Sequence, residues 1–107
     1  MGKDQLQGAL DLLILKILAR GALHGYGLAQ RIQQISEDAL RVEEGSLYPA
    51  LHRMEQLEWI EAEWKPTENG RRAKYYKLTP TGRKQLAREQ EQWSRVAGAV
   101  EKVLRYA

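Results

Sequence analysis

The stretch from Glu43 to Leu57 carries an unusual set of hydrogen-bonding side chains. An ordinary solvated helix face is coated with glutamate and lysine, whereas this stretch has small, aromatic and polar residues on one side of a predicted helix. Such side chains can donate hydrogen bonds to base edges or phosphate oxygens, which a row of acids would repel. The residues concerned are Ser46, Tyr48, Pro49, His52, Arg53 and Gln56.

The helix that must present these residues is predicted from an apolar stripe at helical spacing, which needs a core to cover it. The stripe consists of Leu47, Leu51, Met54 and Leu57. Pro49 is tolerated only near a helix start, where its missing N–H removes no intrahelical bond, so the helix should begin at about residue 45 or 46. Tyr48 and His52 are then candidates for base or phosphate contacts, and Arg53 is a candidate phosphate clamp. For each residue alone, an ordinary surface position is an equally good interpretation.

A second candidate contact lies in the segment from Lys65 to Lys84, which holds seven basic residues and one acid, Glu68. The chain as a whole has a formal net charge of +3, and outside this segment acids outnumber bases. One segment therefore carries the whole positive excess, as expected of an element that contacts phosphates.

The same region predicts a β-hairpin. Residues 59–64 alternate apolar and charged, with Ile60, Ala62 and Trp64 expected to point inward, and residues 73–78 are also β-prone, with Tyr76 and Leu78 on one face. The connection contains Pro and Asn-Gly, typical of a hairpin loop. Such a wing could reach along a nucleic-acid backbone with three exposed cations, Arg71, Arg72 and Lys74.

Two further helices are expected before this unit, over about residues 4–19 and 26–35. The second of them, a short polar connection and the helix at residues 45–57 form a helix-turn-helix pattern. The first helix is apolar around most of its circumference, so it must be covered on more than one side. The second side of this helix could be covered by a partner subunit or by the chain's own core, and the sequence favours neither.

The last helix should start with Thr79 as cap and Pro80 in the first position, and the sequence shows no stop before Ala107. Its apolar residues follow a heptad pattern, and at about 40 Å the helix is longer than the remaining domain can cover. We expect it to pair with a second copy of the chain, although a helix lying on its own domain is the alternative. The expected dimerisation residues are Leu86, Trp93, Val96, Val100, Val103 and Leu104.

The predicted fold is therefore mainly α with a small β-hairpin, organised as a winged helix-turn-helix domain over residues 1–79 and a C-terminal dimerisation helix over residues 80–107. Signals for other chemistry are weak. The chain has no cysteine, its two histidines stand in no metal-ligand spacing, and it carries no phosphate-loop or nucleophile-elbow motif. We expect no enzyme activity, no metal, no cofactor and no membrane span, and a cytoplasmic location.

Several motifs together resemble the PadR family of bacterial winged-helix transcriptional regulators. They are the His24–Gly27 run, Gly45 to Leu51 (Gly-Ser-Leu-Tyr-Pro-Ala-Leu), Gly70 to Thr79 (Gly-Arg-Arg-Ala-Lys-Tyr-Tyr-Lys-Leu-Thr) and Gly82, and the likeness runs from about Leu6 to Val103. The resemblance implies a dimeric repressor with its third helix in the major groove of double-stranded DNA and its wing along the backbone or minor groove. It also implies the small subfamily with a single C-terminal helix. One departure is Glu58, where the family usually has Gly before the strand.

The segment from Trp93 to Val96 is similar to that of multidrug-responsive small members, in which paired indoles sandwich a flat aromatic ligand. The resemblance thus implies an effector site at Trp93 and Val96, while simple packing of Trp93 in the dimer interface is the alternative. The resulting hypothesis is a sequence-specific homodimeric repressor on a roughly two-fold symmetric operator, with a small aromatic effector as candidate ligand. The alternative is a dimeric small-molecule sensor or protein-interaction module without specific DNA binding.

Overall fold

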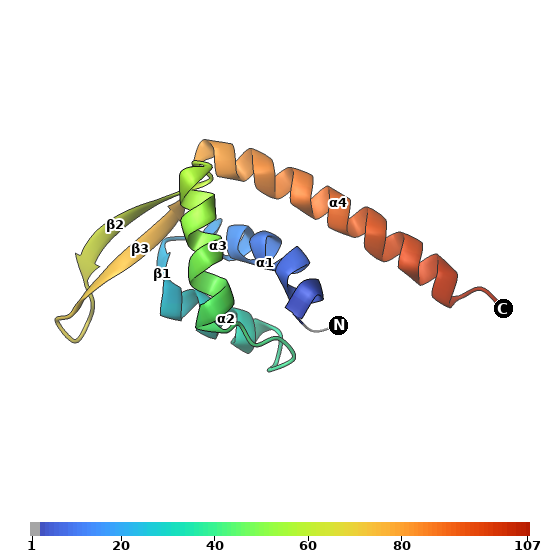
Figure 1. Ribbon diagram of the computed structural model, residues 1–107, viewed down its shortest axis with the longest axis horizontal. Helices are drawn as coiled ribbons and strands as arrows, with labels where there is room; N and C mark the ends of the chain where they lie inside the picture. Colours follow the sequence, from blue (N-terminus) through green and yellow to red (C-terminus); the bar gives the residue numbers. More distant parts are fainter. Residues whose placement is uncertain (1–2) are drawn as a thin grey trace.

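The computed structural model describes residues 3–107, with side-chain environments from residue 9 onward. Figure 1 shows its elements in order: α1 (Lys3–Leu18), β1 (Leu23–His24), α2 (Gly25–Ile35), α3 (Glu44–Gln56), β2 (Ile60–Pro66), β3 (Arg72–Leu78) and α4 (Pro80–Leu104). The predicted mainly α fold with a winged helix-turn-helix and a long C-terminal helix is confirmed. The short strand β1 was not predicted, because a two-residue strand leaves no periodic signal.

The core is built around α1, which explains why that helix is apolar on most sides. Ile14 and Leu15 are fully buried, and Leu12 and Ile17 are partly buried against the same cluster. The helices α2 and α3 and the sheet supply the cover, through buried residues that include Leu28, Leu51, Met54, Ile60 and Tyr76. The chain's own core therefore covers α1 on several sides.

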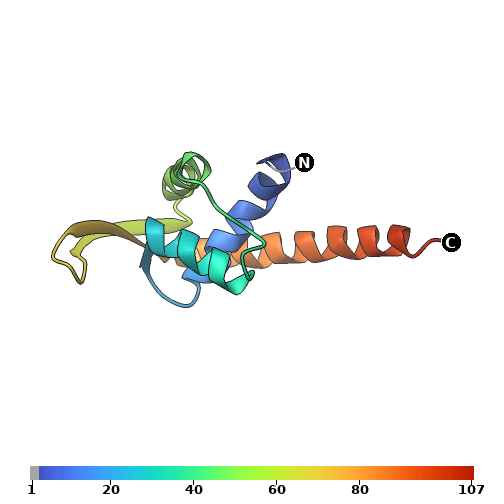
Figure 2. The same cartoon turned by 90° about the horizontal axis from the view of Figure 1, so that it is seen from below.

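The sheet is antiparallel with strand order β1-β3-β2, and its two long strands pair from Ile60↔Leu78 at the core end to Pro66↔Arg72 at the tip. Ile60 is buried and Ala62 partly buried, but Trp64 is 58% exposed. The expectation that Trp64 points into the core is wrong, because the hairpin extends beyond the helices that cover its first residues (Figure 2).

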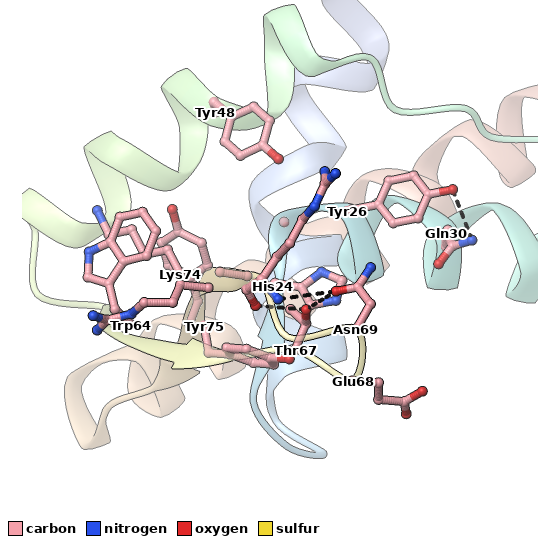
Figure 3. Close-up of a pocket in the computed structure, with 15 residues that line it drawn as sticks. His24, Tyr26, Gln30, Tyr48, Trp64, Thr67, Glu68, Asn69, Lys74 and Tyr75 are labelled. Carbon is pink, nitrogen blue, oxygen red and sulfur yellow. Dashed lines mark hydrogen bonds between the residues drawn. The ribbon is translucent and has the colours of Figure 1, made fainter.

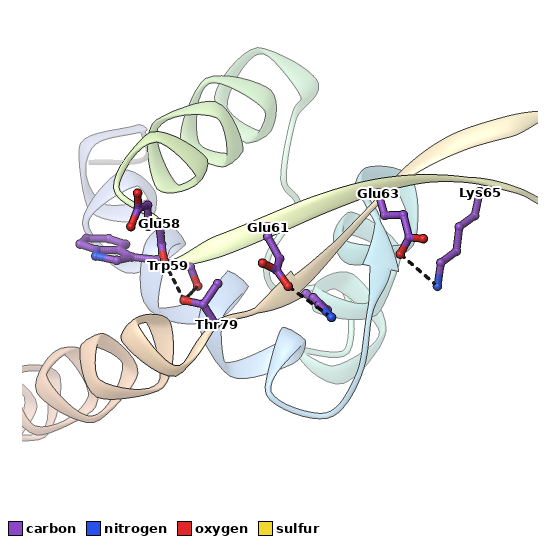
Figure 4. A network of polar contacts seen from close by, with 7 residues as sticks. Glu58, Trp59, Glu61, Glu63, Lys65 and Thr79 are labelled. Atoms are coloured by element: carbon purple, nitrogen blue, oxygen red, sulfur yellow. Dashed lines mark hydrogen bonds and ion pairs between the residues drawn. The ribbon is translucent and has the colours of Figure 1, made fainter.

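The junction of α3, β2 and α4 is fixed by backbone hydrogen bonds. At the end of α3 the N–H of Glu58 donates to the carbonyl of Glu55 and the N–H of Trp59 to that of Met54, both at 3.0 Å, which is a Schellman motif. Figure 4 shows how Thr79 joins this junction: its Oγ1 donates to the Glu58 carbonyl at 2.6 Å. The same oxygen accepts from the N–H of Gly82 at 2.9 Å, so the predicted cap of α4 is confirmed.

The helix α4 has two parts with different surroundings. Its first turns pack against the core, where Gly82 is buried against the Trp59 carbonyl and Leu86 is 9% exposed. From Gln90 onward every residue is exposed, and the helix projects away from the other elements (Figure 1). Among residues 3–107, no helix combines the length and the apolar character that crossing a membrane requires.

Candidate nucleic-acid interface

The helix α3 presents one continuous exposed face. Leu47, Ala50, Leu51 and Met54 are buried, which turns the opposite side outward. The expectation that Leu57 belongs to this buried stripe is wrong, because α3 ends at Gln56 and leaves Leu57 46% exposed. The residues on the outward side are Gly45, Pro49, His52 and Gln56, all exposed. Three of them, Pro49, His52 and Gln56, are predicted DNA-binding residues. The face also matches the expectation of a helix side without large acids.

Arg53 and Ser46 lie on the flank of α3 that faces α1, beside Leu10 and Asp11. Arg53 Nη2 donates to Asp11 Oδ1 at 2.7 Å, and this hydrogen bond raises the pKa of Arg53. The arginine side chain is 50% exposed and the aspartate 17%. The predicted phosphate clamp is thus already engaged within its own chain, to a partner that lies 42 residues away in the sequence.

Tyr48 lies on the other flank of α3 and packs against the start of α2. A Cβ atom on Gly25 would come within 2.8 Å of the Tyr48 ring and hydroxyl, so a larger residue there would displace the Tyr48 side chain. His24 caps α2 by accepting the N–H of Gly27 on Nδ1 at 2.9 Å. The His24–Gly27 run therefore has a structural role in fixing α2 and Tyr48.

The wing carries the three predicted cations in two different states. Arg71 and Arg72 are exposed near the hairpin tip. Lys74 Nζ lies 3.1 Å from Glu55 Oε1 of α3 and 5.7 Å from the centroid of the Tyr76 ring. Burial raises the pKa of Tyr76, which stays neutral beneath this lysine. Lys74 therefore braces the wing against α3.

An open groove of about 1000 Å³ separates the wing from α2 and α3 (Figure 3). Its lining includes the predicted residues Tyr48, Arg71, Arg72 and Lys74. It also includes two exposed aromatic side chains, Tyr26 and Trp64, which sequence reasoning did not assign to the interface. No sequence signal marks them, because their place depends on how far the hairpin extends past the core.

The residues predicted for dimerisation fall into two groups. Trp93, Val96, Val100, Val103 and Leu104 are 51–75% exposed on α4, a large apolar surface for one helix. The predicted effector residues, Trp93 and Val96, are both in this group. Leu86 differs, because it belongs to the core of its own chain. Within residues 3–107, no three His, Cys, Asp or Glu side chains are grouped so that they could hold a metal ion.

Comparison with known proteins assigns this arrangement to a family. The model of the transcriptional regulator PadR-like family matches residues 14–88, which include α2, α3 and the wing. The chain belongs to the PadR family. PadR proteins are regulators of transcription and not enzymes. Because they regulate transcription, membership of the family implies DNA binding.

Individual PadR relatives cover nearly the whole chain. A transcriptional regulator of Mycobacterium tuberculosis is 33% identical over 94 residues, 88% of this chain and 84% of that protein. A PadR-like transcriptional regulator from Bacillus cereus is 31% identical, with a TM-score of 0.83. The match covers 98% of this chain and 100% of the Bacillus cereus chain. A transcriptional regulator from Clostridium thermocellum reaches a TM-score of 0.85 at 27% identity, covering 94% and 97%. These likenesses extend further along α4 than the residues that the family model matches.

Proposed function

We propose that this PadR protein is a homodimeric transcriptional repressor that binds a roughly two-fold symmetric operator, with one α3 in the major groove of each half-site. The observation that carries the proposal is the exposed, acid-free outer face of α3 formed by Gly45, Pro49, His52 and Gln56, with the exposed Arg71 and Arg72 of the wing beyond it. A helix with such a face fits the width of the major groove, and wing cations neutralise phosphates.

In this proposal the residues have distinct roles. His52 and Gln56 point outward from α3 and read base edges, while Ser46, Tyr48 and Arg53 on its flanks meet the backbones on either side of the groove. Arg71, Arg72 and Lys74 contact phosphates from the wing. Pro49 presents an apolar ring near the start of α3, which can contact the DNA without a polar side chain that would need its own hydrogen-bond partner.

The exposed apolar residues of α4 support the dimer. A monomer would leave Trp93, Val100 and Leu104 in water, at a cost of about 25 cal/mol for each Å² of apolar surface. Pairing α4 with the same helix of a second copy buries this stripe and fixes the distance between the two copies of α3. In the paired arrangement, the indoles of Trp93 with Val96 beside them form the proposed site for a flat aromatic effector.

Selection of bound fragments from genomic DNA tests the proposal. We expect enriched fragments to share an inverted repeat with half-sites about one helical turn apart, roughly 10 base pairs. Recovery of fragments with no common sequence would reject specific recognition and favour a sensor or interaction module. A fragment containing the promoter region of the protein's own gene is a suitable first target for gel-shift measurements.

Gln56→Ala gives the matching residue-level test. We expect the variant to select a site with relaxed preference at one position per half-site, because each lost bidentate contact removes about 1–3 kcal/mol of discrimination. Arg71→Ala is the control, since a lost phosphate contact should weaken all sequences alike. An unchanged selection profile for Gln56→Ala would show that this side chain does not read bases.

A further inference from the structure

The inner face of the wing continues beyond the core as a separate surface. Pairing of β2 with β3 places Trp64 opposite Lys74 and Pro66 opposite Arg72. These two pairs follow Ala62↔Tyr76 toward the hairpin tip, and the three pairs occupy alternate positions along each strand. Residues at alternate positions share one face of a strand. Trp64, Lys74 and Arg72 therefore share the face on which Ile60 and Tyr76 are buried, but they lie past the last core contact.

Trp64 is the residue on this surface that the fold itself does not explain. Its side chain is 58% exposed, and the exposed rings of Tyr26 and Tyr48 line the same groove, so the aromatic surface here is clustered and not scattered. Figure 3 shows the indole at the side of the groove, with Lys74 close by and Tyr48 above it on α3. The groove is thus lined by an indole on the wing side and a phenol on the helix side.

The charge of the groove selects among possible occupants. Its lining holds three basic residues, Arg71, Arg72 and Lys74, and one acid, Glu68. A second acid, Glu55, lies next to the groove and is already paired with Lys74. A polyanion with apolar faces between its charges satisfies both the cations and the aromatic side chains.

We propose that this groove holds the sugar-phosphate backbone of one strand of the operator, with Trp64 packed against a deoxyribose between two phosphates. Arg72 meets the phosphate on one side of that sugar, and Lys74 with the Tyr48 hydroxyl meets the phosphate on the other. The proposal rests on the proposed function and deepens it, because it adds an apolar contact to an interface otherwise made of charges and hydrogen bonds. Trp64 then adds an apolar contact to the backbone and reads no base.

Duplex DNA fits this groove for a geometric reason. The strand that leaves the major groove, where α3 lies, must cross the gap between α3 and the wing before the next minor groove. Tyr48 stands at that crossing, since it lies on the flank of α3 that packs on Gly25. Aromatic side chains contact nucleic acids without sequence preference, whereas cations give the salt dependence of binding.

This difference provides the experiment. The wild-type protein and the Trp64→Ala, Trp64→Phe and Arg72→Ala variants are titrated with one operator duplex at several salt concentrations, and thermal unfolding shows that each variant is folded. We expect Trp64→Ala to weaken binding about ten-fold at every salt concentration with an unchanged slope of log K against log salt, because no phosphate contact is lost. Trp64→Phe should recover most of the affinity. Arg72→Ala should lower the slope by about 0.9.

The control is Tyr106→Ala, which removes an aromatic side chain that is 87% exposed at the far end of the molecule and should leave the affinity unchanged. Equal operator affinity for Trp64→Ala and the wild type would overturn the inference while the proposed function stands. A reduced salt slope in Trp64→Ala would also overturn it, since the residue would then act through a neighbouring phosphate contact. If the wild-type protein itself fails to bind any duplex, the proposed function fails first.

Discussion

At the scale of single residues, Glu58 shows how the fold tolerates an unfavourable conformation. It ends α3 with a φ of 63°, in the left-handed region where a Cβ atom is disfavoured. The Schellman bonds to Glu55 and Met54, together with the Thr79 hydrogen bond to its carbonyl, hold it there. Glycine would satisfy the same backbone bonds without the steric cost.

We therefore expect Glu58→Gly to raise the free energy of unfolding by about 0.5–1 kcal/mol, the relief of the left-handed strain less the greater entropy that glycine loses on folding. Chemical denaturation of the two proteins measures this difference. Glu58→Ala is the control, because it removes the carboxylate but keeps the Cβ atom. If Glu58→Ala stabilises the protein as much as Glu58→Gly does, the cause is charge and not backbone conformation.

At the scale of elements, α3 is held on both flanks by ion pairs, and each pair includes one candidate DNA-binding residue. Arg53 is bonded to Asp11 of α1, and Glu55 is paired with Lys74 of the wing. With Arg53 half exposed, the first pair contributes little to stability, of the order of 0–1 kcal/mol. Its main consequence is that, in the proposed complex with DNA, Arg53 would have a carboxylate beside it when it meets a phosphate.

Asp11→Asn should therefore strengthen DNA binding several-fold, because it removes the carboxylate that competes with a phosphate for Arg53. The slope of log K against log salt should steepen by up to about 0.9, the value for one more phosphate contact. Glu55→Gln is the matched variant on the other flank and should act in the same direction through Lys74. Weaker binding by Asp11→Asn would instead show that the ion pair is needed to orient α3.

At the scale of the whole molecule, α4 uses one face for two purposes. Gly82 and Leu86 pack on the chain's own core, and Trp93, Val96 and Val100 continue the same helical face into solvent. The proposed boundary between a DNA-binding domain and a dimerisation helix at residue 79 lies at the cap of α4, yet the core includes its first turns. In the proposed dimer, a change in how the exposed part pairs would thus be transmitted along α4 to the core.

Val100→Glu tests this arrangement. We expect a monomer by light scattering and a loss of operator affinity of at least about 100-fold, because each half-site is then bound separately and a buried carboxylate has no partner. Gly98→Glu is the control, since it adds the same charge on the opposite side of α4, where no atom lies within 4 Å of the position of a Cβ atom. A Val100→Glu protein that remains a dimer would move the interface elsewhere.

Much of this molecule could be predicted from local sequence patterns. The bounds of α2, α3 and the two long strands, the Thr79 cap and the buried faces of α1 and α3 depend on periodicity and on residues close together in the chain. Leu57 is the exception on α3, because it follows the last helical residue and is exposed. The exposed face of α3 followed from the same stripe, since whatever is opposite a buried face is exposed. The motifs from His24 to Gly27, from Gly45 to Leu51 and from Gly70 to Thr79, together with Gly82, indicated the PadR family from the sequence.

The tertiary structure decided what happens between elements. Trp64 has the same alternating pattern as Ile60, and only the extent of the helices shows that one is buried and the other exposed. The pairs Arg53–Asp11 and Lys74–Glu55 join residues far apart in the sequence, and the two-residue β1 exists only because β3 lies beside it. Local patterns fix which side of an element is apolar, but burial depends on where another element ends. The groove between the wing and α3 exists because the hairpin extends beyond the helices that cover its first residues.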